Sequence, residues 1–264
     1  MKRISSFIAV LALLSFNGAP VVLKVKNVEK SFGKIKSGLY MNKYEVSNGD
    51  YHLFLSSLAH DPAAYKAAYP DTAVWARISP LASLYFNHAA YAKYPLVGIT
   101  YENALQYCQW LTDIYNADEG RKFKRVIFRL PTREEWTLAA NGGDLKKQYP
   151  WGTGFIRNSR GMALCNFRED FILHQNKTGK YEEVKAPAGS IRTKLTSPVK
   201  SFFPATYGMY SMSGNVAEMV SEKGIAKGGS YTDPVWGVTI AAEKNYAANA
   251  ADIGFRVAME VIEK

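Results

Sequence analysis

The chain of 264 residues has little cysteine and no long apolar run, and both shortages exclude classes of protein. Two cysteines cannot form a disulfide framework, so packing, hydrogen bonds or a metal must hold the fold. No apolar stretch approaches the roughly 18 residues that a membrane-spanning helix needs. Acidic residues are also few, 23 against 33 Lys and Arg, whereas 47% hydrophobic residues supply an ample core and exclude wholesale disorder.

The sequence also lacks the common catalytic and nucleotide-binding motifs. It contains no Gly-rich phosphate loop, no G-x-S-x-G elbow and no dinucleotide fingerprint. The histidines show no H-x-x-x-H spacing of the kind that binds zinc; they are His52, His60, His88 and His174. The basic cluster at 121–125 comes without a helix-turn-helix, zinc-finger or RNA-binding signature, so we interpret it as a solvated face and expect no nucleic-acid partner.

The first 19 residues have the layout of a secretory signal peptide. Lys2 and Arg3 give a positive start, an apolar stretch follows to Leu14, and 15–19 forms a small, polar exit. No cysteine lies in this region, so no lipid anchor is expected. We therefore predict a periplasmic or secreted protein without a transmembrane segment; the alternative is a buried N-terminal helix.

Three helices are predicted from caps and apolar spacing. The first begins at 47–50, the second at Thr100 and the third at Thr132, which forms a capping box with Glu135. Apolar side chains recur on one face of each helix. The third helix is predicted to end at 141–143, an Asn-Gly-Gly sequence. Short apolar runs separated by turn residues fill the rest of the chain and favour a loop-rich α+β domain.

The stretch at about 60–95 is an aromatic-rich insertion between the first two helices. Its four prolines argue against one long element. Because so many rings are too apolar for disorder, we expect the insertion to be ordered and to present a partner-binding surface. Protein interfaces favour Trp, Tyr and Arg anchors. The predicted contact residues are Trp75, Arg77, Tyr85 and Phe86.

Several short motifs follow one another in an order shared with a known family. They are PLVGIT at 95–100, ALQYCQWL at 104–111, FRLPTREEW at 128–136, YPWG at 149–152, LCN at 164–166, GMYSMSGNVAE at 208–218, GGS at 228–230 and GFR at 254–256. Together they resemble the formylglycine-generating enzyme (sulfatase-modifying factor) domain. The resemblance implies a single α+β domain over 24–264, related to C-type lectin-like folds, with short helices and small antiparallel sheets.

A second resemblance lies within that family. The stretches 69–75, 85–88 and 214–218 are similar to the gliding-motility and type IX secretion members of the Bacteroidetes, such as GldK and GldJ. Those members imply a structural role in an envelope machine. They are lipoproteins, whereas the predicted signal peptide here has no acylatable cysteine. Membrane anchoring is therefore not expected.

The chemistry of the resembled enzymes depends on two thiols. They oxidise a substrate cysteine with a copper-binding cysteine pair placed shortly after Gly-Gly-Ser, and copper(I) prefers such soft ligands. Here Asp233 and Val238 stand where the resemblance places that pair. Cys108 lies on an apolar helix stripe and Cys165 has no nearby base, so neither is predicted to be activated. We expect no copper, no catalytic residues of this kind and no formylglycine formation.

The resemblance also implies one calcium ion. Its ligands would be the carbonyls of Gly214 and Val216 and the side chains of Ser211 and Glu218. A serine is a poorer calcium ligand than the usual Asn or Asp, so the predicted site is weakened. The alternative is a metal-free turn in which backbone amides bind Glu218. The family's second calcium site is expected to be empty, because 190–197 contains no acid.

A binding groove is predicted next to the missing thiols. Ser230, Tyr231, Asp233 and Trp236 form a polar and aromatic group where the resemblance places the substrate groove. The alternative is a plain loop with a solvated aspartate.

These observations predict a non-catalytic extracytoplasmic protein that acts by binding. Its partner would be a protein of the cell envelope, within a secretion or gliding apparatus, or an acidic glycan. Removal of Lys2 and Arg3 with the predicted signal peptide takes the formal net charge from +10 to +8, which favours an anionic partner. Two alternatives stay open: an enzyme of the same superfamily with another metal or none, and a lectin-like carbohydrate binder. Metal analysis separates them, because stoichiometric iron or copper would favour the enzyme.

Overall fold

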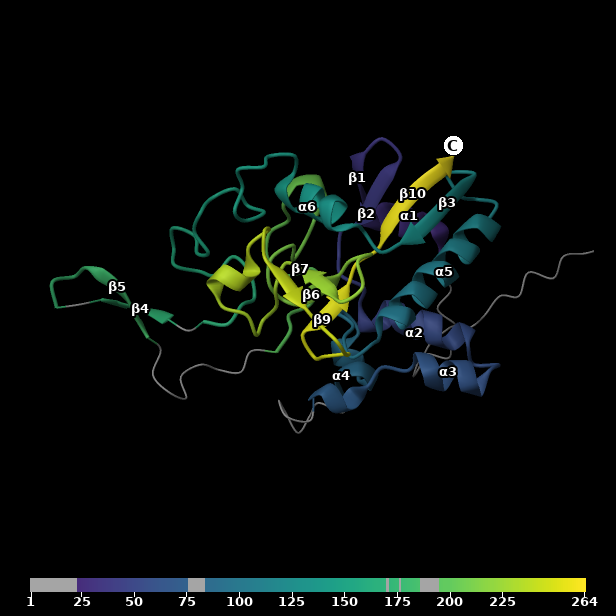
Figure 1. The fold of residues 1–264 in the computed structure, drawn as a ribbon, viewed down its shortest axis with the longest axis horizontal. Helices are drawn as coiled ribbons and strands as arrows, with labels where there is room; N and C mark the ends of the chain where they lie inside the picture. Colours follow the sequence, from purple (N-terminus) through teal and green to yellow (C-terminus); the bar gives the residue numbers. More distant parts are fainter. Residues whose placement is uncertain (1–22, 76–83, 170, 176, 186–194) are drawn as a thin grey trace, which may run out of the picture.

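The computed structural model describes residues 23–75, 84–169, 171–175, 177–185 and 195–264. The predicted signal peptide and Arg77 lie outside these ranges. The described chain combines short helices with small sheets, as the sequence predicts (Figure 1). The helices are α1 (Val25–Ser31), α2 (Asn48–Ser57), α3 (Pro62–Ala68), α4 (Leu84–Asn87), α5 (Tyr101–Ala117) and α6 (Arg133–Asn141). Short 3-10 turns are η1 (Thr72–Trp75), η3 (Ala89–Tyr91), η4 (Thr206–Gly208) and η5 (Val235–Val238).

The three predicted helices are α2, α5 and α6, and each begins with a capping box. Ser47, Thr100 and Thr132 accept hydrogen bonds from the backbone N–H three residues later. These bonds satisfy donors that the first helical turn would otherwise leave unpaired. α6 ends at Gly142, whose φ of 65° is the left-handed conformation that glycine adopts most readily. Local side-chain chemistry therefore fixes both ends of α6.

The first sheet contains β1 (Phe32–Lys36), β2 (Leu39–Asn42), β10 (Ala258–Glu263) and β3 (Arg125–Arg129), antiparallel in the order β1-β2-β10-β3. The longest helix, α5, packs along β3. Asn116 of α5 exchanges two hydrogen bonds with the backbone of Val126, at 2.9 and 3.0 Å. The buried side chains of α5 face the main core, and they include Cys108. Figure 1 shows α5 beside β3 and β10.

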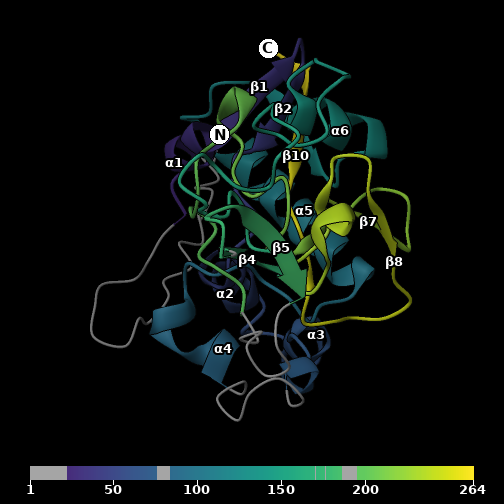
Figure 2. The same cartoon turned by 90° about the vertical axis from the view of Figure 1, so that its left-hand side faces the viewer.

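The second sheet has the order β8-β7-β6-β9. Its strands are β8 (Glu243–Asn245), β7 (Ile225–Lys227), β6 (Ala217–Met219) and β9 (Ile253–Phe255). β6 and β9 pair in parallel, which departs from the expected antiparallel sheets. Only Arg256 and Val257 separate β9 from β10, so the C-terminal chain passes directly from one sheet to the other. The remaining strands, β4 (Phe171–Gln175) and β5 (Tyr181–Lys185), form a hairpin that extends away from the body in Figure 1 and faces the viewer in Figure 2.

The aromatic insertion becomes α3, η1, α4 and η3, packed against the core. Trp75, Tyr85 and Phe86 are only 2–3% exposed. Phe86 stacks on His52 with ring centroids 4.1 Å apart, and the Tyr85 hydroxyl donates to the Pro95 carbonyl at 2.6 Å. The described part of the insertion, 60–75 and 84–95, packs against the core. The prediction that these three rings form a contact surface is wrong, because they pack in the core of this chain and a partner cannot reach them.

Candidate functional site

A tight turn follows the second sheet's β7 and orders the segment where the resembled enzymes carry their thiols. Gly229 has a φ of 63°, and a Cβ there would collide with the carbonyl oxygen of Gly237. The turn brings Ser230 against Asp233: the Ser230 N–H and hydroxyl donate to the Asp233 carboxylate at 2.9 and 2.6 Å. Glycine is required because the two backbone segments touch.

A lysine from β8 occupies the centre of this turn. Lys244 Nζ lies 2.9 Å from Asp233 Oδ2 and 2.6 Å from Asp252 Oδ2. Burial lowers the pKa of Lys244, but its bonds to Asp252 and Asp233 outweigh that effect and the net shift is upward. For Asp252, burial raises the pKa, but the bonds from Lys244 and Thr232 outweigh it and the net shift is downward. These two shifts favour the charged forms of Lys244 and Asp252.

The polar groups of this ion cluster bond to one another, which leaves few of them free to react with a substrate. The hydroxyls of Ser230 and Thr232 both bond to Asp252, at 3.3 and 2.6 Å, and Lys244 also contacts both hydroxyls. Ser230 is fully buried, so its hydroxyl is not placed to attack a substrate. Val238, at the second thiol position, is also fully buried and apolar. The sequence analysis missed Lys244 and Asp252, because no local motif links them to the turn.

The predicted groove is only partly accessible. Ser230 and Tyr231 are buried, Asp233 is half-buried and Trp236 is 64% exposed. Tyr231 stacks on Trp75 of the insertion, with centroids 6.3 Å apart and ring planes 15° apart. Trp75 and Tyr85 of the predicted partner surface thus lie in one buried cluster with Tyr231 of the predicted groove. A groove lined by all four residues is not formed, because two of them belong to the core.

The predicted calcium ligand Glu218 is part of a buried ion pair. Both its oxygens lie 2.5 Å from the Arg256 guanidinium, and Trp136 Nε1 donates to Oε2 at 2.6 Å. Both partners of the pair are essentially unexposed. The fork-shaped guanidinium satisfies a carboxylate bidentately, which is the strong form of such a bond. Both residues stood in motifs of the sequence, Arg256 in GFR and Glu218 in GMYSMSGNVAE, but their pairing was not predicted.

With Glu218 arranged in this way, the four residues do not fit a calcium ion. The carboxylate is already neutralised by Arg256, and the remaining side-chain donor is the neutral hydroxyl of Ser211, which has no partner among the described residues. Calcium prefers several hard oxygens that carry net negative charge. We therefore base no step of the function on calcium, and chelation tests whether an ion binds.

A second carboxyl group lies close to this pair. Glu45 is buried and accepts a hydrogen bond from Asn215 Nδ2 at 2.9 Å, while its Oε2 has no partner within the described structure. Burial raises the pKa of Glu45 well above its usual value, and the charge of Glu218 raises it further. Arg256 and Asn215 lower it, but by less. Burial therefore disfavours the charged form of Glu45 relative to an exposed glutamate.

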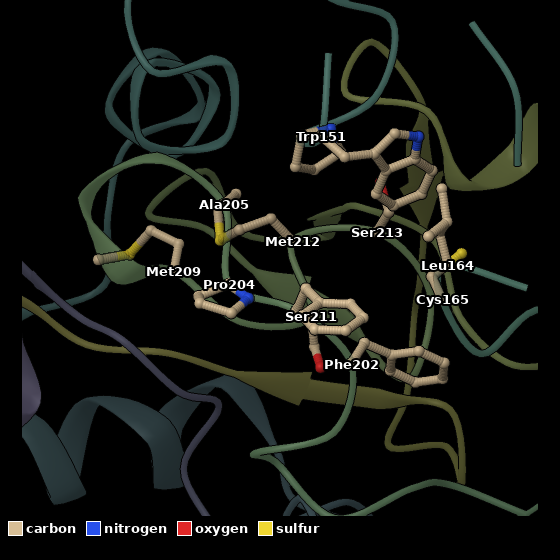
Figure 3. A pocket seen from close by; sticks show the side chains of 12 residues that line it. Trp151, Leu164, Cys165, Phe202, Pro204, Ala205, Met209, Ser211, Met212 and Ser213 are labelled. Carbon is tan, nitrogen blue, oxygen red and sulfur yellow. The ribbon is translucent and has the colours of Figure 1, made fainter. Parts of the chain in front are cut away.

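The surface carries two neighbouring hollows that the sequence analysis did not predict. The larger, of about 1100 Å³, is lined mainly by 151–161, including Trp151, Phe155, Arg157 and Arg160. The smaller, of about 50 Å³, is shown in Figure 3 with Trp151 and Leu164 on one side and Pro204 and Ser211 on the other. Trp151 and Leu164 line both hollows. The sequence signals were the YPWG, LCN and GMYSMSGNVAE motifs, which supply Trp151, Leu164 and Ser211 to the lining.

Neither cysteine offers an accessible thiol. Cys108 and Cys165 are both buried, and burial raises the pKa of Cys108. Among the described residues, no group of three or more His, Cys, Asp or Glu side chains is placed to hold a metal. Within the same ranges, no helix is both long and apolar enough to cross a membrane.

Residues 29–261 match the model of the sulfatase-modifying factor enzyme 1-like domain family. The chain is 25% identical over 212 residues to a formylglycine-generating enzyme of Mus musculus, covering 70% of this chain and 49% of that one. It is 30% identical over 130 residues to the enzyme of Thermomonospora curvata, covering 49% and 33%. It is 33% identical over 125 residues to an inactive Cα-formylglycine-generating enzyme 2 of Mus musculus, covering 47% and 30%. The matched segments thus span between about a third and a half of these relatives' own lengths.

Two solved structures share the fold. CarF matches with a TM-score of 0.53 and 20% identity, covering 84% of this chain and 86% of that one. PvdO from Pseudomonas aeruginosa matches with a TM-score of 0.53 and 18% identity, covering 84% and 80%. At this identity the likeness establishes the fold alone.

Proposed function

Since the chain belongs to the sulfatase-modifying factor enzyme 1-like domain family, we propose that it is a non-catalytic member that acts by binding. The observation that carries this proposal is the ion cluster of Asp233, Lys244 and Asp252. It occupies the turn where the resembled enzymes hold copper with two thiols. The amine of Lys244 occupies the carboxyl groups of Asp233 and Asp252, and the cluster offers no soft thiolate ligand for copper.

Two further observations support the proposal. The position of the second thiol is taken by the buried Val238, and the chain's own cysteines are buried. In addition, the chain is similar to proteins named as inactive Cα-formylglycine-generating enzyme 2, from Bos taurus and Mus musculus. A non-catalytic member would thus have counterparts elsewhere in the family.

The test is incubation with a sulfatase-type peptide that contains the substrate cysteine, with and without added copper. A formylglycine-generating enzyme in the same buffer is the positive control. We expect the control to convert the thiol to an aldehyde and this chain to leave the peptide mass unchanged. Conversion by this chain would overturn the proposal. Stoichiometric copper or iron in the purified protein would favour the alternative, an enzyme with altered chemistry.

The same proposal places the protein outside the cytoplasm, in the periplasm or secreted. Its support is the charged start, apolar stretch and small-residue exit of residues 1–19. The stretches 69–75 and 85–88 favour an envelope partner of the gliding or type IX secretion kind. Fractionation of cells that express the full chain, with N-terminal sequencing of the product, tests the location. An unprocessed cytoplasmic product would contradict it.

A further inference from the structure

The larger hollow has the size of a ligand site. Its volume of about 1100 Å³ lies at the upper end of pockets that hold small ligands. One continuous segment, 151–161, supplies most of its wall, and Leu164 and Val235 complete it. The described wall of the hollow therefore comes mainly from one stretch of the chain.

The wall of the hollow is preorganised by its own backbone bonds. The Asn158 N–H donates to the Met162 carbonyl at 3.0 Å, and the Leu164 N–H donates to the Ile156 carbonyl at 2.9 Å. The Asn158 side chain accepts from two further backbone amides, those of Arg160 and Met162. A wall held in this way loses little conformational entropy when a ligand binds.

Aromatic rings form the apolar part of the wall. Trp151 stacks on Tyr149 with centroids 4.9 Å apart and ring planes 6° apart, and its Nε1 donates to the Phe155 carbonyl at 2.9 Å. Phe155 is 76% exposed, beyond what a core requires. Exposed rings with polar neighbours mark ligand-binding grooves. A sugar ring has an apolar face that packs flat on such aromatic surfaces.

The charge of the wall is positive. Arg157 and Arg160 contribute guanidinium groups, and none of the described lining residues is acidic. Arg157 is held in place by Glu169 at 3.2 Å and by the Gly161 carbonyl at 3.0 Å. Arg160 is exposed, and no ion pair or side-chain hydrogen bond involves its guanidinium within the part of the chain that the structure describes. A free guanidinium fork matches a carboxylate or sulfate group.

We propose that this hollow binds an anionic sugar, with a ring packed on Trp151 and Phe155 and its acidic group on Arg160. This inference rests on the proposed binding function and names its ligand class. An acidic peptide fits less well, because the amides of Asn158, Gly161, Met162 and Leu164 already donate within the segment. They leave few backbone donors for the strand addition by which extended peptides often bind.

Calorimetric titration of the full chain tests the proposal with three probes of equal length. They are an oligogalacturonate, which carries carboxylates, a sulfated dextran oligosaccharide and a neutral dextran oligosaccharide. We expect at least one anionic probe to bind, with an affinity that falls as the salt concentration rises. The neutral probe should bind with at least tenfold lower affinity than that anionic probe, because it lacks the bond to a charged group. Which anionic probe binds more tightly distinguishes a uronate from a sulfated ligand.

Variants locate the site. Arg160→Gln should weaken binding about tenfold, and Phe155→Ala should also weaken it. Both residues are exposed, so neither substitution should disturb the fold. Arg125→Gln, an exposed arginine on β3, is the matched control and should bind like the natural chain. The proposal is overturned if neither anionic probe binds at millimolar concentration, if the neutral probe binds equally, or if Arg160→Gln keeps full affinity. Equal binding of an oligoglutamate peptide would also overturn it.

The two proposals fail separately. If no sugar binds and the peptide assay still gives no formylglycine, the binding role returns to a protein partner. If formylglycine forms, the non-catalytic function fails whatever the sugar result.

Discussion

One buried region contains two carboxyl groups and one guanidinium, those of Glu45, Glu218 and Arg256. Arg256 pairs with Glu218 through both carboxylate oxygens. Glu45 is left with one hydrogen bond from Asn215 and with an elevated pKa. One cation cannot neutralise two buried carboxylates, so at the scale of the residue the free energy of folding depends on the protonation of Glu45.

Replacing Glu45 by glutamine should therefore stabilise the protein as pH rises. Below 4.5, the pKa of a glutamate in the unfolded chain, the carboxyl group is protonated in both states and does not change the free energy of unfolding. As pH rises from 4.5 toward the raised pKa of the folded state, the unfolded chain releases the proton more readily, so the fold is increasingly destabilised. We expect Glu45→Gln to unfold like the natural chain near pH 4 and to be clearly more stable than the natural chain at pH 8. Denaturant titrations at both pH values measure this.

The control is Glu45→Ala, which removes the same carboxyl group but also loses the bond from Asn215, and it should be less stable than Glu45→Gln at both pH values. A Glu45→Gln variant no more stable than the natural chain at pH 8 would show that the fold does not raise the pKa of Glu45.

At the scale of the element, the cap of α6 connects local sequence to the buried core. The Glu135 N–H donates to the Thr132 hydroxyl at 3.2 Å, while the Glu135 carboxylate accepts from the Thr132 N–H at 3.0 Å. The same carboxylate receives two bonds from Arg129 at 2.7 and 2.8 Å. α6 in turn carries Trp136, which donates to Glu218. The cap thus fixes a helix that supports the buried ion pair.

Removing this cap should cost about 1 kcal/mol of unfolding free energy, the usual loss for a Thr→Ala change at an N-cap. We expect this loss for Thr132→Ala in denaturant unfolding. Thr132→Ser keeps the hydroxyl and serves as the matched control, with stability near that of the natural chain. Equal loss in both variants would mean that the methyl group, and not the cap, contributes the stability.

At the scale of the whole molecule, the question is whether a metal contributes to stability. A calcium ion held at a hundredfold excess over its Kd would add about 2.7 kcal/mol to the unfolding free energy. Because Arg256 already neutralises Glu218, we expect excess EDTA to leave the melting temperature unchanged. Thermal melts with and without the chelator measure this. A fall that calcium restores, and that Glu218→Gln abolishes, would show that an ion displaces the arginine.

The sequence alone determined the features that depend on near neighbours. The starts of α2, α5 and α6 follow from Ser47, Thr100 and Thr132, because a cap bonds to an amide only three residues away. The family followed from motifs that are read in order, and the missing thiols followed from the residues after Gly229. Each of these features is local, so no tertiary contact was needed to predict it.

Only the tertiary structure decided which charges meet and which rings are buried. Glu45 bonds to Asn215 across 170 residues, and Lys244 joins Asp233 and Asp252 from another strand. Trp75 looked like an interface anchor, but Tyr231 covers it from a distant turn. Burial and ion pairing are properties of surroundings that folding assembles from remote segments. Composition and spacing do not encode those surroundings, so the accessible hollow at 151–161 became visible only in the folded chain.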